Sequence, residues 1–325
     1  MSEIDGGVKA ELDELVRLYK KYLWADEGIQ SYVEKQGVFI EPARFYSQLP
    51  TKAEIRLAFE YQDDFMAQGG FFQNLEVNDQ EMLRRLGAWQ PYAKEFDPPS
   101  SGDKEDPKSF YWQNPAFSFS DAMAYWCMLR SKQPSTVVEI GSGFSTLIAA
   151  QALEANKKGR LICIEPYPKP WLSTLSAVEL FKRPIQDFSI EEFTGFFESG
   201  DILFIDSTHT VKVGSDCLWI YLILLPSIPV DLTIHVHDIS LPFGVNQQRA
   251  LDVHVHWIEQ YLLLAYWLDN PRIQLLYSSS YLKANYLAEL SQLMGGKYAG
   301  GVYGSIRHGK KWLMLFIWFG KTKKK

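Results

Sequence analysis

The chain of 325 residues contains only three cysteines, Cys127, Cys163 and Cys217, and they lie far apart. An odd, scattered set of this kind excludes a disulfide framework and lacks the close spacing of a zinc site. It fits a reducing compartment, so we expect a cytoplasmic protein. The start, MSEIDGGVKAELDEL, has no basic stretch followed by an apolar one, so we expect no signal peptide.

Long apolar runs and a basic excess are also missing. The run LWIYLILLPSIPV (218–230) is broken by prolines, and WLMLFIWF (312–319) is shorter still. Both fall short of the roughly 20 residues that span a bilayer, so we expect no membrane span. The net charge is −6. A general nucleic-acid binder usually carries a basic excess, so we expect no nucleic-acid partner.

What remains is typical of a globular protein with one large α/β domain and an appendage. Hydrophobic residues make up 46% of the chain. Residues 1–108 are expected to form a helical N-terminal extension and a linker. Leu12, Leu15 and Val16 recur at helical spacing, and FDPPSSGDKEDPK (96–108) combines prolines, small residues and charges.

From residue 109 onward, buried strands alternate with helices, and this alternation predicts a doubly wound, mainly parallel sheet. We place this Rossmann-like domain at 109–311, with GGVYGSIRH (300–308) as an antiparallel last strand. Residues 312–325 are predicted to be an extra apolar strand and a basic tail. Ligands bind such sheets beyond the carboxyl ends of the strands. The predicted strand ends are all acidic: Glu139, Glu165, Asp187, Asp206 and Asp238.

The first strand leads into a glycine turn, Gly141-Ser142-Gly143, which lets the backbone approach a ligand closely. Such a turn can hold a nicotinamide dinucleotide, a nucleotide phosphate or S-adenosylmethionine, or no ligand. A nicotinamide fingerprint requires a third glycine where this chain has Thr146. Glu139, two residues upstream of the turn, favours a cationic ligand over a pyrophosphate. The sulfonium and ammonium groups of S-adenosylmethionine meet that requirement.

The next two strand ends indicate a nucleoside. Glu165 follows the glycines by a little over twenty residues, a spacing at which a carboxylate accepts both ribose hydroxyls. Gln186 and Asp187 close the predicted third strand, where they can accept from an adenine amino group. A helix or turn cap is the alternative for Asp187.

Taken together, VVEIGSGFST, IEP, DILFIDSTH and HVHDISLPF resemble a class I S-adenosylmethionine-dependent methyltransferase over about residues 110–308. More narrowly, they resemble the branch with an IDxxH fourth strand and an HDI fifth strand. The resemblance implies S-adenosylmethionine as the cofactor. It places Glu139, Gly141, Ser142 and Gly143 at the amino-acid end of that cofactor. Glu165 matches the ribose ligand, and Gln186 and Asp187 match the adenine side.

The catalytic end allows two interpretations. In one, Asp206 and Asp238, with His237 nearby, hold Mg²⁺ or another divalent cation that orients an acceptor hydroxyl. Related metal-dependent O-methyltransferases place acids at these two strand ends, although they often carry an acid where this chain has His237. In the other, His209 is a general base that takes the hydroxyl proton. Purely structural roles for both histidines are the third alternative.

We therefore predict an enzyme that transfers a methyl group to a small-molecule or sugar hydroxyl. Acceptors of the sugar, glycan or natural-product type follow from the resemblance alone. The alternatives are a hydroxylase-like metal enzyme of the same fold, a nicotinamide-dependent oxidoreductase and a non-catalytic cofactor-binding protein. A homodimer is left open. In WIEQY (257–261), either Glu259 or Tyr261 faces the site, or both only pack.

Overall fold

The computed structural model describes residues 4–22, 24–39, 41, 43–67, 70–73, 75–103, 106–117, 119–295, 306–307, 310–311 and 317–321. It divides into two compact units, Met1–Glu60 and Tyr61–Lys325. The sequence analysis placed the boundary at 108 instead. Within the described residues no helix combines the length and the apolar character needed to cross a membrane.

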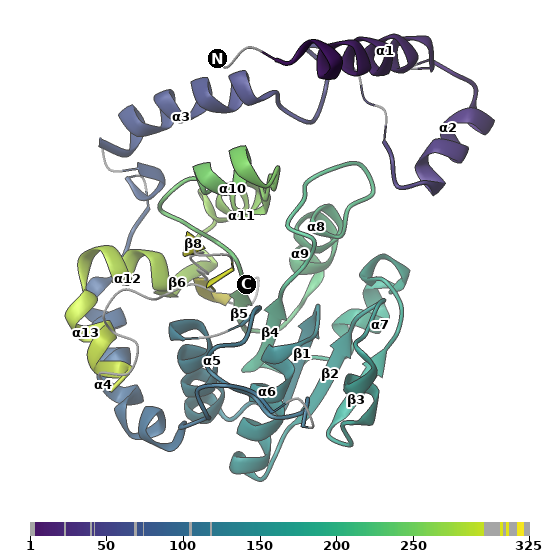
Figure 1. The fold of residues 1–325 in the computed structure, drawn as a ribbon. Helices are drawn as coiled ribbons and strands as arrows, with labels where there is room; N and C mark the ends of the chain where they lie inside the picture. The colour runs from purple at the N-terminus through teal and green to yellow at the C-terminus, as the bar shows by residue number, and fades with distance from the viewer. Residues whose placement is uncertain are drawn as a thin grey trace. The chain divides into compact units, whose positions relative to one another are not determined.

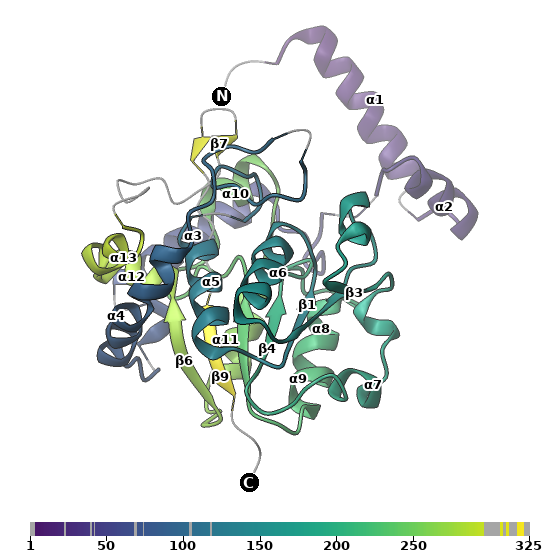
Figure 2. The ribbon, with the colours of Figure 1, turned by 90° about the horizontal axis from the view of Figure 1, so that it is seen from below.

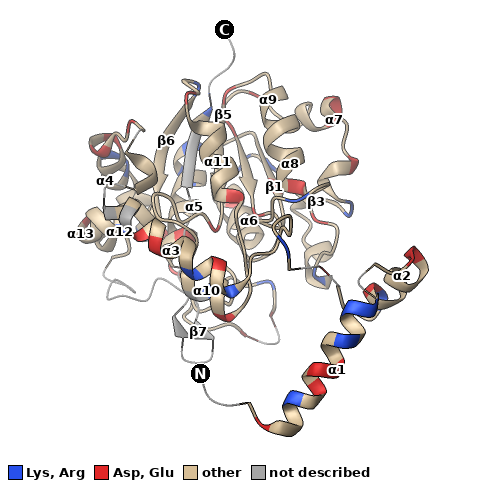
Figure 3. Ribbon diagram, turned by 90° about the horizontal axis from the view of Figure 1, so that it is seen from above, with Lys and Arg blue, Asp and Glu red and all other residues tan. Residues whose placement is uncertain are grey.

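The first unit is helical. It contains α1 (Gly6–Tyr22), α2 (Glu27–Lys35) and the beginning of α3 (Lys52–Ala67). The carboxylate of Asp26 caps α2 by accepting the Ile29 N–H at 3.1 Å. Residues of both charge signs recur along α1 (Figure 3), and none of its residues is buried. The N-terminal segment is helical, as the sequence predicted, although this unit ends at Glu60 and the predicted extension reached residue 108.

The second unit is built around a seven-stranded sheet (Figure 1). From one edge to the other the strands are β3 (Val178–Phe181), β2 (Arg160–Ile164), β1 (Thr136–Ile140), β4 (Asp201–Ile205), β5 (Leu232–Val236), β9 (Ile317–Lys321) and β6 (Ile273–Ser278). The first five are parallel, and β9 runs antiparallel to both of its neighbours. The predicted doubly wound, mainly parallel sheet is confirmed.

Helices cover both faces of this sheet, as Figure 2 shows. The chain runs outward from β1 to β3 on one side and from β4 to β5 on the other. Right-handed crossovers in opposite directions put the connecting helices on opposite faces. In each of the strands β1, β4 and β5, all five residues are buried. Burial on both faces accounts for the nearly continuous apolar sequences of these strands. The helices are α4 (Asp79–Glu95), α5 (Ser120–Lys132), α6 (Phe144–Asn156), α7 (Ile190–Thr194), α8 (Asp216–Trp219), α9 (Leu225–Ser227), α10 (Gln247–Asp252), α11 (Glu259–Trp267), α12 (Ser279–Asn285) and α13 (Leu287–Leu293).

The segment before the sheet belongs to this second unit. Helix α4 packs against α5 and α13 and buries Met82, Leu86 and Trp89. Helix α5 is buried continuously from Ser120 to Leu129, and it packs against α6. Helix α4, which the sequence analysis assigned to the N-terminal extension, therefore contributes to the core around the sheet.

The C-terminal prediction needs correction. The antiparallel strand of the main sheet is β9, from the apolar run that we placed outside the domain. The expected last strand, 300–308, lies largely outside the described residues. Its described part, β7 (Ile306–Arg307), pairs with β8 (Lys310–Lys311) in a separate two-stranded ribbon. An apolar sequence suits β9 because this strand has a partner on each side.

Candidate active site

The glycine turn follows β1 directly and packs on the end of β4. Gly141 has a φ of +82°, and a Cβ there would lie 2.0 Å from the Asp206 carbonyl oxygen. The turn therefore requires glycine at this position. A Cβ on Gly143 would meet no atom within 4 Å. Folding therefore requires glycine at position 141 but leaves room for a side chain at position 143.

A buried hydrogen-bond network fixes the turn from below. The Gly143 N–H donates to Thr146 Oγ1 at 3.0 Å, and the Thr146 hydroxyl donates to Glu139 Oε2 at 2.5 Å. The Tyr125 hydroxyl donates to the other Glu139 oxygen at 2.8 Å. Burial raises the pKa of the fully enclosed Glu139 carboxyl to about 7, although these donors oppose the shift.

A cavity of about 410 Å³ opens beside the turn, at the carboxyl ends of β1, β2 and β4. Gly141, Glu165 and Asp206 are among its lining residues, whereas Glu139 is not. The Glu165 carboxylate accepts the Ser142 N–H at 3.2 Å and the Tyr167 N–H at 2.8 Å. These two bonds hold it at the rim of the cavity, where the ribose ligand was predicted.

The predicted adenine pair separates in the structure. Neither residue ends the third strand, because β3 stops at Phe181 and Ile185–Asp187 forms a short 3-10 turn. Gln186 lines the cavity, and its Nε2 donates to the Gly214 carbonyl at 3.0 Å. Asp187 is exposed and lies outside the cavity lining.

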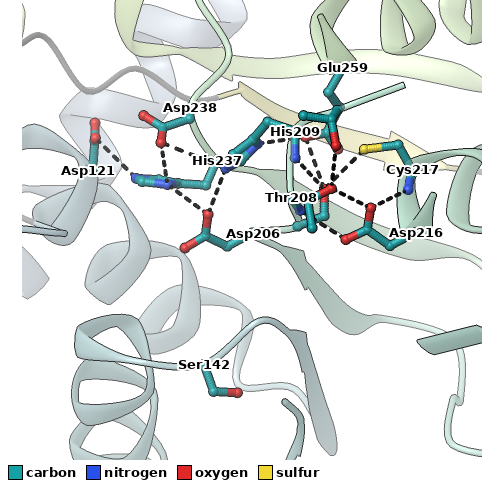
Figure 4. Close-up of polar contacts among 12 residues, drawn as sticks. Asp121, Ser142, Asp206, Thr208, His209, Asp216, Cys217, His237, Asp238 and Glu259 are labelled. Atoms are coloured by element: carbon teal, nitrogen blue, oxygen red, sulfur yellow. Dashed lines mark hydrogen bonds and ion pairs between the residues drawn. The ribbon is translucent and has the colours of Figure 1, made fainter. Parts of the chain in front are cut away.

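Beyond the cavity, acids and histidines gather at the ends of β4 and β5 (Figure 4). His209 Nε2 lies 3.2 Å from Asp206 Oδ1 and 3.7 Å from Asp238 Oδ2. Both His209 and Asp238 have positive φ angles, 58° and 53°. These turns bring the two side chains back over the sheet edge. Sequence positions 29 residues apart thereby share one small site.

The other nitrogen of His209 is also engaged. Its Nδ1 lies 2.7 Å from Oε2 of Glu259, the first residue of α11. Burial alone would lower the pKa of His209. The Asp206 and Glu259 carboxylates outweigh burial and raise that pKa to about 10.

His237 lies on the opposite side of Asp206. Its Nδ1 is 3.3 Å from Asp206 Oδ1, and its Nε2 is 3.7 Å from Asp121 Oδ2 on α5. Burial opposes charge on His237, but the Asp206 and Asp238 carboxylates raise its pKa well above the usual range. Burial would raise the pKa of Asp206, and the two imidazoles reverse this and hold it far below its usual range.

Three of these side chains could hold a metal ion. Asp206, His209 and Asp238 each offer one ligand atom, and these three atoms lie within 4.8 Å of one another. Two carboxylate oxygens and an imidazole nitrogen suit several divalent first-row metals better than the expected Mg²⁺, which prefers oxygen ligands. His237, which the sequence analysis placed near the metal, is not in this group.

Asp121 was not predicted from the sequence as a site residue, and Glu259 was left open between facing the site and packing. Both are acids in the first turn of a largely buried helix, with 1% exposure each. An acid within an apolar helical run is the signal that could have found them, because burying a charge requires a partner. The structure gives Tyr261 a different place. Its hydroxyl accepts the Val245 N–H, and its ring packs on Phe71.

Comparison with known proteins bears on the kind of domain that holds this site. A family model described as a methyltransferase domain matches residues 138–239, from β1 to just beyond β5. An uncharacterized protein of Archaeoglobus fulgidus is 30% identical over 174 residues, which is 50% of this chain and 76% of that protein. The chain therefore contains a methyltransferase domain at residues 138–239, in agreement with the resemblance to S-adenosylmethionine-dependent methyltransferases. This match supports the predicted methyltransferase over the nicotinamide-dependent alternative.

Solved structures show remote likeness to the methyltransferase. An O-methyltransferase from Bacillus cereus in complex with SAH is 13% identical, with a TM-score of 0.38 over 82% of this chain and 100% of that one. The O-methyltransferase TomG from Streptomyces achromogenes, in complex with SAM, is 14% identical, with a TM-score of 0.37 over 78% and 94%. Likeness at this level says nothing about the acceptor of the methyltransferase.

Proposed function

We propose that this methyltransferase transfers the methyl group of S-adenosylmethionine to a hydroxyl of a small-molecule or sugar acceptor. A divalent cation held by Asp206, His209 and Asp238 assists the transfer. The observation that carries the proposal is the position of Asp206. It lines the cavity beside the glycine turn and also belongs to the three-residue ligand group. A cofactor in the cavity and a cation in the cluster would be neighbours.

The charge of the cluster fits a cation. Four carboxyl groups, those of Asp121, Asp206, Asp238 and Glu259, surround two imidazoles, and burial raises the pKa of Asp121 to about 7. Buried negative charge on this scale needs positive charge beside it. Without a metal, protons on the histidines supply it, which explains their raised pKa values. A divalent cation can take the place of the proton that His209 Nε2 shares with the two aspartates.

The chain's own residues would align the reactants. Glu165 and Gln186 both line the cavity, where Glu165 would accept the ribose hydroxyls and Gln186 would face the adenine. The network beneath the turn holds the backbone that would face the amino-acid end. A bound cation would lower the pKa of an acceptor hydroxyl. In-line transfer then depends on how well the protein aligns acceptor oxygen and methyl carbon.

The geometry favours His209 as a ligand over His209 as a free base. Both of its ring nitrogens are already engaged, Nδ1 by Glu259 and Nε2 by Asp206. A general base needs a lone pair directed at the acceptor, whereas Nε2 is directed at the two aspartates that would hold the cation with it. An oxygen-rich site for a hard cation also suits an oxygen nucleophile better than a nitrogen or sulfur one.

The test measures cation and cofactor binding separately. Mn²⁺ affinity is followed by electron paramagnetic resonance, and affinity for S-adenosylhomocysteine (SAH) by calorimetry. We expect Asp238→Asn to weaken Mn²⁺ binding at least about tenfold while SAH affinity changes little. Glu191→Gln, an exposed acid on α7, is the control and should change neither. A wild-type protein that binds SAH but no Mn²⁺ at millimolar concentration would contradict the cation assignment.

A further inference from the structure

Glu259 is a buried carboxylate that comes to the site from α11. Its Oε2 contacts His209 Nδ1 at 2.7 Å and accepts the Ser207 hydroxyl at 3.2 Å. Its Oε1 accepts the Tyr221 hydroxyl at 2.8 Å. The backbone closes the arrangement, because the Glu259 N–H donates to the His209 carbonyl at 3.2 Å. The side chain therefore has one geometry available.

This arrangement fixes the orientation of the His209 ring. Oε2 of Glu259 lies within hydrogen-bond distance of Nδ1, so this nitrogen is the one that donates to the carboxylate. The remaining nitrogen, Nε2, faces Asp206 and Asp238. Trp257 packs on the imidazole with 4.6 Å between ring centroids, which restricts rotation of the ring.

We propose that Glu259 is the positioning residue of the site: it holds the Nδ1–H form of His209, so that the Nε2 lone pair is directed at the cation bound by Asp206 and Asp238. The inference rests on the proposed function. Metal-ligating histidines commonly donate their second N–H to a carboxylate, which fixes the ring and strengthens the ligand.

A packing role alone does not account for this residue. Burying a carboxylate costs free energy that an amide or an apolar side chain of similar size would avoid. Here both oxygens of the Glu259 carboxylate form hydrogen bonds. Oε2 contacts Ser207 and His209 in the loop after β4, and Oε1 accepts from Tyr221 in the helical segment that follows this loop. A carboxylate is the side chain that keeps Nδ1 protonated when a cation displaces the Nε2 proton.

The first experiment compares Glu259→Gln with Tyr221→Phe. The glutamine has nearly the same shape but loses the charge. The phenylalanine removes one donor to Glu259 and leaves the carboxylate on His209. We expect Glu259→Gln to weaken Mn²⁺ binding by about 10- to 100-fold. Tyr221→Phe should have a clearly smaller effect, and SAH affinity should be unchanged in both.

Equal Mn²⁺ affinity in wild type and in folded Glu259→Gln would overturn the inference and leave the proposed function standing. A wild-type protein that binds no Mn²⁺ would overturn the cation assignment, and the inference with it. A second measurement needs no variant of Glu259. In ¹⁵N spectra of the Zn²⁺-loaded wild type, the His209 signals, assigned by their absence in His209→Asn, should show a protonated Nδ1. A protonated Nε2 would overturn the inference.

Discussion

Glu139 is a buried carboxylate whose pKa lies near neutrality, directly beneath the glycine turn. Three side chains donate to it or contact it, from α5, α6 and β2: Tyr125, Thr146 and Cys163. The residue thus joins the cofactor-binding turn to the core. Its charge can act on a bound sulfonium or ammonium group through the turn.

Replacement of Glu139 by glutamine should change how stability depends on pH. The folded-state pKa of about 7 is above the usual value of 4.5 for a glutamate, so the folded protein keeps a proton that the unfolded chain loses. The wild type therefore loses stability as pH rises from about 4.5 to 7. Glu139→Gln does not share this loss. As the pH rises through this range, we expect the unfolding free energy of Glu139→Gln, relative to that of the wild type, to increase by about 3 kcal/mol.

Urea unfolding of both proteins from pH 4.5 to pH 8 measures this change. The lost hydrogen bonds of the variant add a constant offset, so only the pH-dependent part is informative. A difference that stays flat across this range would show that Glu139 ionises normally in the folded protein.

At the residue scale, sequence reasoning located acids at strand ends but not the directions of their side chains. Glu165 and Asp206 line the cavity, whereas Glu139 and Asp187 do not. Strand periodicity fixes the face of a sheet on which a residue lies, and neighbours from distant segments decide its contacts. Glu259 contacts His209 although the two residues are 50 positions apart in the sequence. No local sequence pattern shows such a contact.

The glycine turn is the element in which fold and cofactor binding meet. It joins β1 to α6. It also packs against Asp206, the first residue after β4. Because Asp206 also belongs to the ligand group, a shift of this turn would move both halves of the site.

Alanine substitutions at the two glycines should separate folding from binding. Gly141→Ala places a methyl group against the Asp206 carbonyl at positive φ, so we expect a loss of about 2–4 kcal/mol in unfolding free energy. Gly143→Ala meets open space and should cost less than about 1 kcal/mol. Denaturant unfolding without cofactor measures both. Equal losses would contradict the assignment of the close contact to Gly141 alone.

At the element scale, the alternation of strands and helices was predictable, and two features were not. One is the break between two helices: α10 ends at Asp252 and α11 begins at Glu259, with His254 at a φ of 55°. The placement of β9 depends on pairing with β5 and β6, which are distant in sequence. Apolar composition predicts a buried strand but not its neighbours.

At the scale of the whole molecule, the site lies where the order of strands reverses. From β1 the chain proceeds to β2, and it returns on the other side of β1 as β4. The helices on either side leave a crevice at the carboxyl ends of these two strands, the usual ligand position in such sheets. The cavity lies there, and the acid and histidine cluster continues from it toward β5.

All the residues of the cavity and of the cluster belong to the second compact unit, Tyr61–Lys325. We therefore expect a chain of residues 61–325 to fold and to bind SAH within about threefold of the full-length affinity, a difference of about 0.7 kcal/mol. Calorimetry with SAH compares the two chains, and circular dichroism confirms that the shorter one is folded. A folded 61–325 chain with strongly reduced SAH affinity would show that residues 1–60 take part in cofactor binding. If affinity is retained while methyl transfer to an acceptor is lost, the first unit acts on the acceptor side, because cofactor binding and acceptor binding are then separable along the chain.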